Sequence, residues 1–328
     1  MDNYTPIMNK RSEYSLGRLN ELKKNILKIP ELRKFPKLTI YCAGSYARLE
    51  ASKYSDIDLF FLCSTPKDEL FEPKTSQIRL FSQIINIVKE MGFPKLSNDG
   101  EYLIIEHTDE LIKELGSRED DYQNHFTARM LLLLESKCLY KEEIYNDAIK
   151  RVVDSYFRDY PGHMETFRPT FLINDIIRYW KTLCLNYEYK RNQPPTDEST
   201  ETKQKVKDYK LKYSRMNTCF ATIAALLNKG SNINQENIIK IINDTPMERL
   251  DQLFSDIKGS EYLLKELRDQ YSEFLFFTGL SEKRLHDKFR NKIFREKAFQ
   301  EASKFGDTMF SIVQLACKEN DSLRYLVI

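Results

Sequence analysis

The pattern of apolar and polar positions in the first third of the chain predicts alternating helices and strands. Residues 12–28 carry leucines and isoleucines at helical spacing. Apolar runs at 37–45 and 55–63 predict two strands, and the second is apolar enough to be buried on both faces. Helical spacing returns at 75–91, and "EYLIIEH" at 101–107 predicts a third strand. This order indicates a small domain with a mixed sheet.

Beyond Asp120 helical spacing dominates and strand patterns almost vanish. The segments that suit helices are 124–137, 141–158, 170–190, 214–229, 235–243, 246–257, 260–277 and 282–317. Residues 191–215 interrupt them, and their prolines, serines and threonines predict a loop that runs into six basic residues. We therefore expect an α+β fold, with a small mixed-sheet domain at 1–120 followed by a mostly α-helical domain at 121–328.

The composition narrows the range of partners. The 51 basic residues nearly balance the 49 acidic ones, which predicts no strong general affinity for nucleic acid or acidic targets. Six cysteines in separate apolar segments and only four histidines favour buried thiols over disulfides or a zinc site. No apolar run reaches the roughly 18 residues of a membrane span, and no signal peptide is recognisable. We expect a cytoplasmic protein with no membrane partner; its oligomeric state stays open.

The most specific chemistry lies in "GSYARLEASKYSDIDL" at 44–59. Asp56 and Asp58 are two positions apart on a predicted strand, so their side chains share one face. Two carboxylates held about 3 to 5 Å apart can bridge a pair of Mg²⁺ ions, which prefer oxygen ligands and substrate phosphates. Gly44 permits a tight turn, and Ser45 offers a hydroxyl and backbone N–H groups to an anion. Together these groups suit a metal-bound triphosphate.

This arrangement resembles the nucleotidyltransferase superfamily related to DNA polymerase β. The shared motif is an apolar strand, Gly-Ser, a spacer of ten residues in this chain, and Asp-x-Asp in a second strand. Arg48 and Ser55 add to the match, because that form is common among bacterial members. The segment 127–149 is also similar to a helix of bacterial proteins that resemble the PII uridylyltransferase, with Lys137 and Lys141 in place of an arginine and a glycine.

The resemblance implies a third carboxylate from a later strand, which completes the metal site and activates the attacking hydroxyl. Glu106 is the expected residue because it ends the apolar run at 101–107, and Glu101 or Asp99 are alternatives. The expected catalytic and metal-binding residues are thus Asp56, Asp58 and Glu106. Two Mg²⁺ ions are the expected cofactors, with Mn²⁺ as an alternative.

In the resembled enzymes a helical domain closes over the nucleotide and supplies basic residues to its phosphates. Residues 170–190 offer a polar stripe on a mostly apolar helix, and the basic run before 216 offers further cations. Both could equally be solvated surface charges. The expected nucleotide ligands are Gly44, Ser45, Arg48, Arg178, Lys181, Lys212 and Arg215.

The sequence therefore predicts a metal-dependent enzyme that moves a nucleoside monophosphate from an NTP or dNTP to an acceptor hydroxyl and releases pyrophosphate. The acceptor stays open between a protein side chain, a tRNA end, a small molecule and another nucleotide. One alternative is an oligonucleotide or cyclic-nucleotide signal synthase of a bacterial antiphage system. Others are a catalytically silent nucleotide sensor and a toxin or antitoxin partner.

Overall fold

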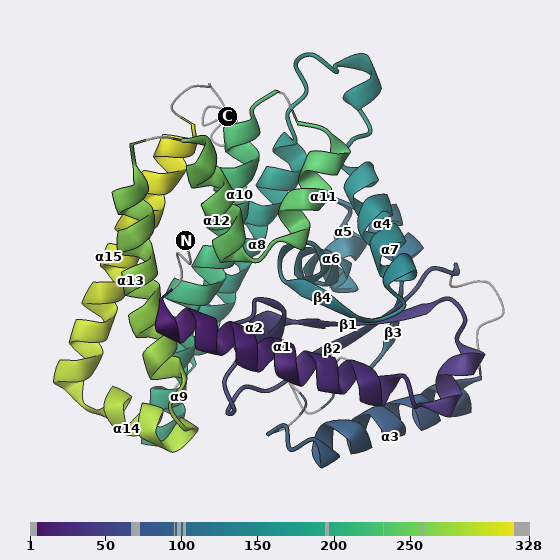
Figure 1. The fold of residues 1–328 in the computed structure, drawn as a ribbon, viewed down its shortest axis with the longest axis horizontal. Helices are drawn as coiled ribbons and strands as arrows, with labels where there is room; N and C mark the ends of the chain where they lie inside the picture. Colours follow the sequence, from purple (N-terminus) through teal and green to yellow (C-terminus); the bar gives the residue numbers. More distant parts are fainter. Residues whose placement is uncertain are drawn as a thin grey trace. The chain divides into compact units, whose positions relative to one another are not determined.

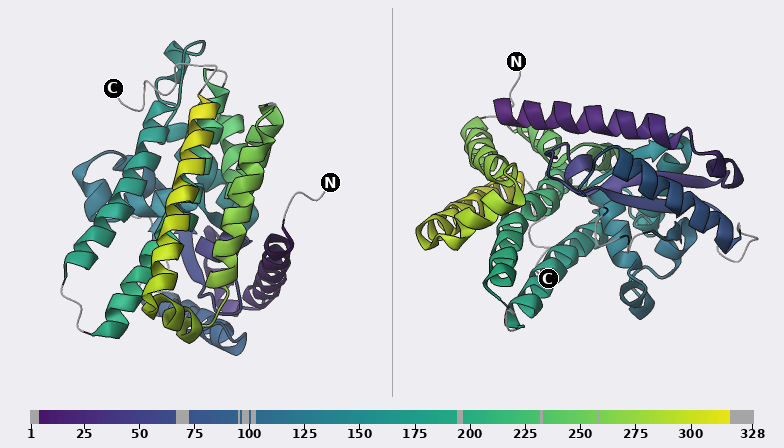
Figure 2. Two further views of the ribbon diagram at one scale, coloured as in Figure 1. Left: turned by 90° about the vertical axis from the view of Figure 1, so that its left-hand side faces the viewer. Right: turned by 90° about the horizontal axis from the view of Figure 1, so that it is seen from below.

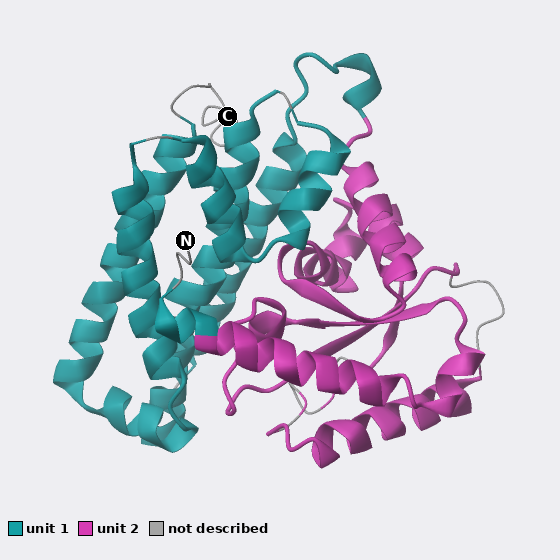
Figure 3. Ribbon diagram, in the orientation of Figure 1, with its two compact units in different colours: residues 1–9, 159–328 teal, residues 10–158 magenta. Residues whose placement is uncertain are grey.

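The fold is known from a computed structural model, shown as a ribbon in Figure 1. It describes residues 5–66, 73–94, 96, 100, 103–193, 197–231, 233–257 and 259–317. The chain divides into two compact units, coloured separately in Figure 3. One unit is Lys10–Arg158, which holds the sheet, and the other comprises Met1–Asn9 and Asp159–Ile328, which is helical. Each unit is described by itself below.

A mixed sheet forms the centre of the unit Lys10–Arg158, which is unit 2 in Figure 3 and is called the sheet unit below. Among the described residues it has four strands in the order β3-β2-β1-β4. They are β1 (Leu38–Ala43), β2 (Asp58–Cys63), β3 (Ile105–His107) and β4 (Ser136–Tyr140). Strand β1 is antiparallel to both β2 and β4, and β3 is parallel to β2. The predicted pair of adjacent strands and the mixed sheet are both confirmed.

Helices cover both faces of this sheet (Figure 1). On one side lie α1 and α3, and on the other lie α4, α6 and α7. The helices of the unit are α1 (Pro6–Ile26), α2 (Gly44–Ala47), α3 (Lys74–Glu90), α4 (Thr108–Lys113), α5 (Arg118–Tyr122), α6 (His125–Leu134) and α7 (Glu142–Ser155). A 3₁₀ turn, η1, spans Pro30–Lys34.

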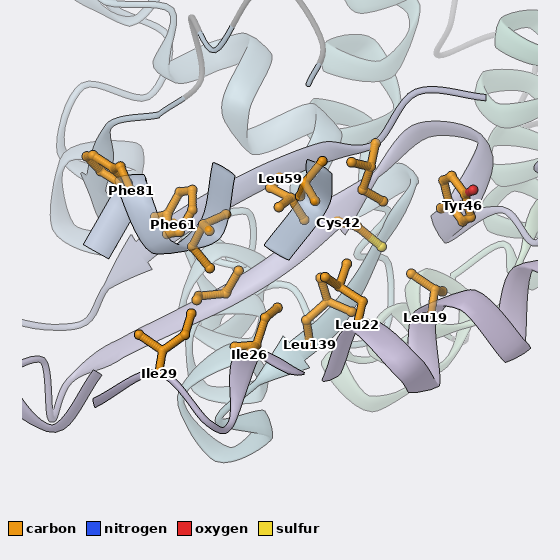
Figure 4. Close-up of a cluster of buried hydrophobic side chains, with 14 of the residues drawn as sticks. Leu19, Leu22, Ile26, Ile29, Cys42, Tyr46, Leu59, Phe61, Phe81 and Leu139 are labelled. Atoms are coloured by element: carbon orange, nitrogen blue, oxygen red, sulfur yellow. The ribbon is translucent and has the colours of Figure 1, made fainter. Parts of the chain in front are cut away.

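The core beneath α1 and α3 positions the second strand. Figure 4 shows Leu22 and Ile26 of α1 beside Leu59 and Phe61 of β2, with Phe81 of α3 nearby. The rings of Phe61 and Phe81 meet edge to face, with centroids 5.0 Å apart. Each fully buried side chain of this kind contributes about 1.5–3 kcal/mol. The strand that carries Asp58 is therefore firmly anchored from this side.

Strand β4 was not predicted from the sequence. The helix expected at 124–137 ends at Leu134, and the chain then pairs with β1. The segment up to Arg158 consequently packs with the sheet, although the sequence grouped residues beyond 120 with the helical part. Local spacing could not reveal this, because the strand is created by pairing with residues about a hundred positions earlier.

The other unit, unit 1 in Figure 3 and called the helical unit below, is a set of packed helices. Figure 2 shows α13 and α15 side by side within it. Its helices are α8 (Thr170–Asn192), α9 (Glu198–Lys210), α10 (Met216–Lys229), α11 (Gln235–Asn243), α12 (Pro246–Asp256), α13 (Glu261–Thr278), α14 (Glu282–Arg290) and α15 (Lys292–Ala316). A 3₁₀ turn, η3 (Tyr160–Gly162), precedes α8, and a π-helical turn, η4 (Leu211–Arg215), joins α9 to α10. None of the described helices is long and apolar enough to cross a membrane.

Two local expectations for this unit were wrong. The predicted loop at 191–215 contains α9, which begins where Asp197 caps the helix by accepting from the Thr200 N–H (2.6 Å) and buries Tyr209. The single helix expected at 282–317 breaks at Asn291, whose side chain caps α15. In both cases a capping side chain set the boundary.

Candidate functional site

The turn after β1 brings a glycine against an aspartate. Ala43 and Asp58 are partners in the β1–β2 ladder, so Gly44 lies directly beside Asp58. Gly44 has a φ of +72°, and a Cβ built on it would lie 2.6 Å from Asp58 Oδ2. A side chain here would be strained by the backbone and would also collide with the carboxylate. The glycine thus keeps the space beside Asp58 open.

Helix α2 is a single turn that anchors this glycine to the core. Tyr46 and Ala47 are buried, and the Tyr46 ring meets Phe93 edge to face with centroids 5.4 Å apart. Ser45 stays half-buried, and its carbonyl accepts from the Glu50 N–H at 2.8 Å. Contacts with the core therefore hold the turn in place, while Ser45 remains partly accessible.

The two aspartates of the Asp-x-Asp segment flank a fully buried residue. Ile57 is completely inaccessible, Asp56 is exposed and Asp58 is half-buried. Because neighbouring residues of an extended chain point to opposite sides, both carboxylates lie on the side away from Ile57. Oxygen donors grouped in this way suit Mg²⁺ or Mn²⁺, and Gly44 leaves room beside one of them.

The spacer between the glycine and the aspartates is fixed by α1. Buried Ser15 accepts from the Ala51 N–H (3.0 Å), and its hydroxyl donates to the Arg11 carbonyl (2.7 Å). Within the spacer, the Ser52 N–H donates to Ser55 Oγ at 3.0 Å. These bonds make the ten residues a defined loop, which fixes how Asp56 approaches the strand.

Arg48, an expected nucleotide ligand, is held by two carboxylates. Its guanidinium pairs with Glu50 at 2.8 Å and with Glu135, and only 8% of the residue is exposed. The contact with Glu135 joins the spacer to the segment between α6 and β4. Arg48 therefore has a clear role in the fold, and its role in nucleotide binding stays a prediction.

Glu106, the expected third carboxylate, lies on β3. It pairs with Leu62, four positions beyond Asp58, so both acids project from the same face of the sheet. At about 3.3 Å per residue, their positions differ by roughly 13 Å along the strands. Its role as third carboxylate stays a prediction. The alternatives Glu101 and Asp99 lie outside the described residues.

Aromatic side chains occupy the face between these two acidic positions. The Tyr41 ring stacks on Phe60, with centroids 5.4 Å apart, and meets Tyr145 at 6.0 Å. Burial raises the pKa of Tyr41, and the nearby Tyr145 and Glu106 add to this effect. Tyr41 is therefore uncharged at physiological pH and separates the two acidic positions.

Glu106 instead lies close to two residues that the sequence analysis did not single out. They are Glu110 on α4 and His125 at the start of α6, and one ligand atom from each of the three lies within 4.8 Å of the others. The separation of Glu106 and Glu110 by four positions was readable from the sequence. Nothing in the sequence links His125 to them, because only the packing of α6 brings it there.

The remaining expected phosphate ligands belong to the helical unit. Arg178 approaches Asp175 on the same helix at 3.5 Å, and Lys181 is exposed. Lys212 and Arg215 both lie in the π-helical turn η4, a rare element that is frequent at functional sites. Their assignment as nucleotide ligands stays a prediction.

Helix α8 runs antiparallel to the stretch that holds η4. The Trp180 and Phe220 rings meet with centroids 5.7 Å apart, and further along α8 the Tyr187 phenol donates to Asp208. Burial raises the pKa of Asp208, while Lys212 acts in the opposite direction. The predicted cations of α8 and η4 therefore lie on neighbouring segments of one unit.

A mixed sheet covered by helices on both faces, with an acidic pair beside a glycine turn, is the arrangement of a nucleotide-handling domain. Residues 23–151 match the model of the protein family described as the nucleotidyltransferase domain. The match contains all the described strands and confirms the predicted relation to the polymerase β-like superfamily. This part of the chain is a nucleotidyltransferase domain, which implies nucleotide substrates and a transferase activity. No curated protein matches the chain.

Proposed function

We propose that this protein transfers a nucleoside monophosphate from an NTP or dNTP to an acceptor hydroxyl, with release of pyrophosphate, and that a divalent cation is required. The observation that carries the proposal is the contact between Gly44 and Asp58, within a nucleotidyltransferase domain. A glycine with a positive φ that leaves space at a carboxylate oxygen suits a site that admits a ligand. An ordinary solvated strand end has no need of it.

Asp56 and Asp58 would hold the cations, Mg²⁺ or Mn²⁺, because both offer oxygen donors on one side of the chain. When bound, these ions stabilise the charge on the attacking and leaving oxygens of an in-line displacement. The buried neighbours Ile57 and Leu59 keep the two carboxylates in place, so little rearrangement is needed.

Ser45 would contribute its hydroxyl to a phosphate oxygen, since it remains half-buried beside the anchored turn. In the transfer, the acceptor oxygen forms a bond to the α-phosphorus and the bond to the β-phosphate oxygen breaks. Pyrophosphate leaves with the electron pair of that bond. The acceptor proton passes to a base, and Glu106 is the residue that we propose for this role.

The test incubates the purified full-length protein with each labelled NTP and dNTP, in the presence of Mg²⁺ or Mn²⁺. Pyrophosphate release is quantified and the products are resolved by mass. We expect Asp56→Asn and Asp58→Asn to abolish turnover while circular dichroism stays unchanged. Asp154→Asn, at an exposed position on α7, is the matched control and should leave turnover unchanged. Undiminished pyrophosphate release by the Asp56 and Asp58 variants would overturn the mechanism.

The same products identify the acceptor. Free oligomers or cyclic products would indicate a signal synthase, whereas label retained on protein or RNA would indicate a modifying enzyme. Absence of turnover by the wild-type protein with every nucleotide would replace the enzyme by a nucleotide sensor.

A further inference from the structure

Three side chains from separate elements of the sheet unit meet at one point. They are Glu106 on β3, Glu110 on α4 and His125 at the start of α6. One ligand atom from each lies within 4.8 Å of the others. Two carboxylates this close in a partly buried site favour a bound cation, because its charge offsets their mutual repulsion.

The histidine gives independent evidence for a missing partner. His125 is only 7% exposed, and its Nδ1 has no hydrogen-bond partner among the described residues. Its Nε2 points to Glu106 Oε2 at 3.9 Å, which is too long for a hydrogen bond. A buried imidazole without a partner is costly, because its polar atoms lose their contact with water.

A second buried histidine of the same unit shows the ordinary solution. His107 is 5% exposed, and its Nδ1 lies 2.7 Å from the carbonyl oxygen of Thr65. His107 thus has a backbone hydrogen-bond partner, whereas the His125 ring faces two carboxylates. Burial alone does not account for the position of His125.

Neighbouring contacts hold the histidine in place. Arg129, one turn further along α6, is fully buried and donates to both oxygens of Asp120 at 2.8 and 2.6 Å. It also donates to the Leu111 carbonyl of α4 (2.8 Å) and to the Tyr156 hydroxyl (2.9 Å). These bonds tie α6 to α4, so the distance between His125 and Glu110 is set by a rigid network.

We propose that Glu106, Glu110 and His125 bind a divalent transition-metal ion at a site distinct from the Asp56–Asp58 pair. The ion takes one imidazole nitrogen and two carboxylate oxygens, and water fills its remaining positions. Zn²⁺ and Mn²⁺ fit this donor set better than Mg²⁺, because imidazole favours transition metals. The inference shares only Glu106 with the proposed function, and it is tested by metal binding instead of turnover, so either proposal can fail without the other.

Such an ion would join β3, α4 and α6. It would offset the repulsion between Glu106 and Glu110 and give one nitrogen of the His125 ring a bond that no described residue supplies. Because metal binds the folded arrangement, it would raise the stability of the sheet unit by linkage. Its role is therefore structural, about four strand positions away from Asp58.

The experiment measures metal binding to the full-length protein after chelator treatment, by equilibrium dialysis with Zn²⁺ and with Mn²⁺. An Asp56→Asn/Asp58→Asn variant serves as background, so that the other acidic pair does not contribute. We expect this variant to bind one ion per chain and to melt at a higher temperature when the ion is present. The Mn²⁺ arm guards against thiol binding, because the six cysteines favour Zn²⁺.

In that background, His125→Ala and Glu110→Gln should each weaken binding by at least about tenfold. His286→Ala is the matched control: its Nε2 also lies 3.9 Å from a glutamate, Glu282, in the helical unit, and no effect is expected. If His125→Ala does not fold, Glu110→Gln alone decides. Unchanged binding by the folded variants, or no binding by the background variant, would overturn the proposal. Equal affinity of the protein for Mg²⁺ and Mn²⁺ would show that the His125 nitrogen does not bind the ion.

Discussion

The start of β2 and the cluster on β3, α4 and α6 are two acidic regions on the same face of one sheet, and they are built in opposite ways. At β2, Gly44 has no side chain, so Asp58 has open space beside it. In the cluster, a buried histidine fills the space beside two glutamates. In our proposals, the first arrangement would admit a ligand from outside, whereas the second would enclose a small cation. Similar carboxylates therefore serve different purposes according to what packs beside them.

The largest expected effect separates the two regions by activity. Asp58→Asn should lower turnover by at least about a thousandfold, because a charged ligand of the proposed metal ions is lost. His125→Ala and Glu110→Gln, assayed as folded proteins, should keep turnover within about threefold of the wild type, a change of under 1 kcal/mol. Pyrophosphate release measures all of them.

Glu106→Gln then decides between the two roles of that residue. Loss of turnover to the level of Asp58→Asn would assign it to catalysis, while retention of turnover with loss of metal binding would assign it to the cluster.

The next effect tests the network behind His125. Arg129→Ala should lower the free energy of unfolding by about 3–5 kcal/mol, because it leaves fully buried Asp120 without its bidentate partner. Arg151→Ala is the control, since its pair with Asp109 is about one-third exposed on both sides and is worth about 1 kcal/mol at most. Urea unfolding followed by circular dichroism gives both values. Equal losses would mean that Arg129 does not hold this region together.

A third prediction concerns the two buried ion pairs of Arg48, which lies in the spacer between Gly44 and Asp56. Arg48→Ala removes the guanidinium that pairs with both Glu50 and Glu135 at low exposure, so a loss of about 3 kcal/mol in unfolding free energy is expected. If Arg48 acts through the fold alone, KM for the nucleotide stays unchanged in the fraction that remains folded. A rise in KM of tenfold or more would assign Arg48 to the phosphates.

Two glycines separate backbone strain from collision with Asp58. Gly44 and Gly92 have nearly the same φ, +72° and +71°, and nothing lies within 4 Å of a Cβ on Gly92. Both alanine variants should lose about 1–2 kcal/mol of unfolding free energy from the backbone. Only Gly44→Ala should also lower turnover, by about tenfold or more, because its Cβ displaces the Asp58 carboxylate. Equal turnover in the two variants would show that the contact has no catalytic importance.

The smallest expected effect tests the cations of the helical unit. Lys181→Ala should raise KM for the nucleotide about threefold if this exposed lysine contacts a phosphate, and Lys190→Ala, exposed near the end of the same helix, should not. Comparison at low and high salt sharpens the result, because the effect of an exposed charge falls as ionic strength rises. No difference between the two variants would remove Lys181 from the predicted ligands.

Much of the fold was readable from local sequence. The first two strands, the helices beside them and helices such as α11 and α12 follow apolar spacing closely. Two elements, α9 and β4, were not predicted, and the reasons differ. Helix α9 was hidden by its polar composition although Asp197 marked its start, and β4 exists only through its pairing with β1.

The sequence by itself determined the Gly44–Ser45 and Asp56–Asp58 pattern, because all of its members lie in one short stretch and the period of a strand sets their direction. It also placed these residues in a nucleotidyltransferase domain. Tertiary structure alone decided that Arg48 pairs with Glu135, and that Glu106 lies beside Glu110 and His125. The physical reason is distance along the chain: local spacing orients neighbours, whereas contacts between separate elements depend on how helices pack on the sheet.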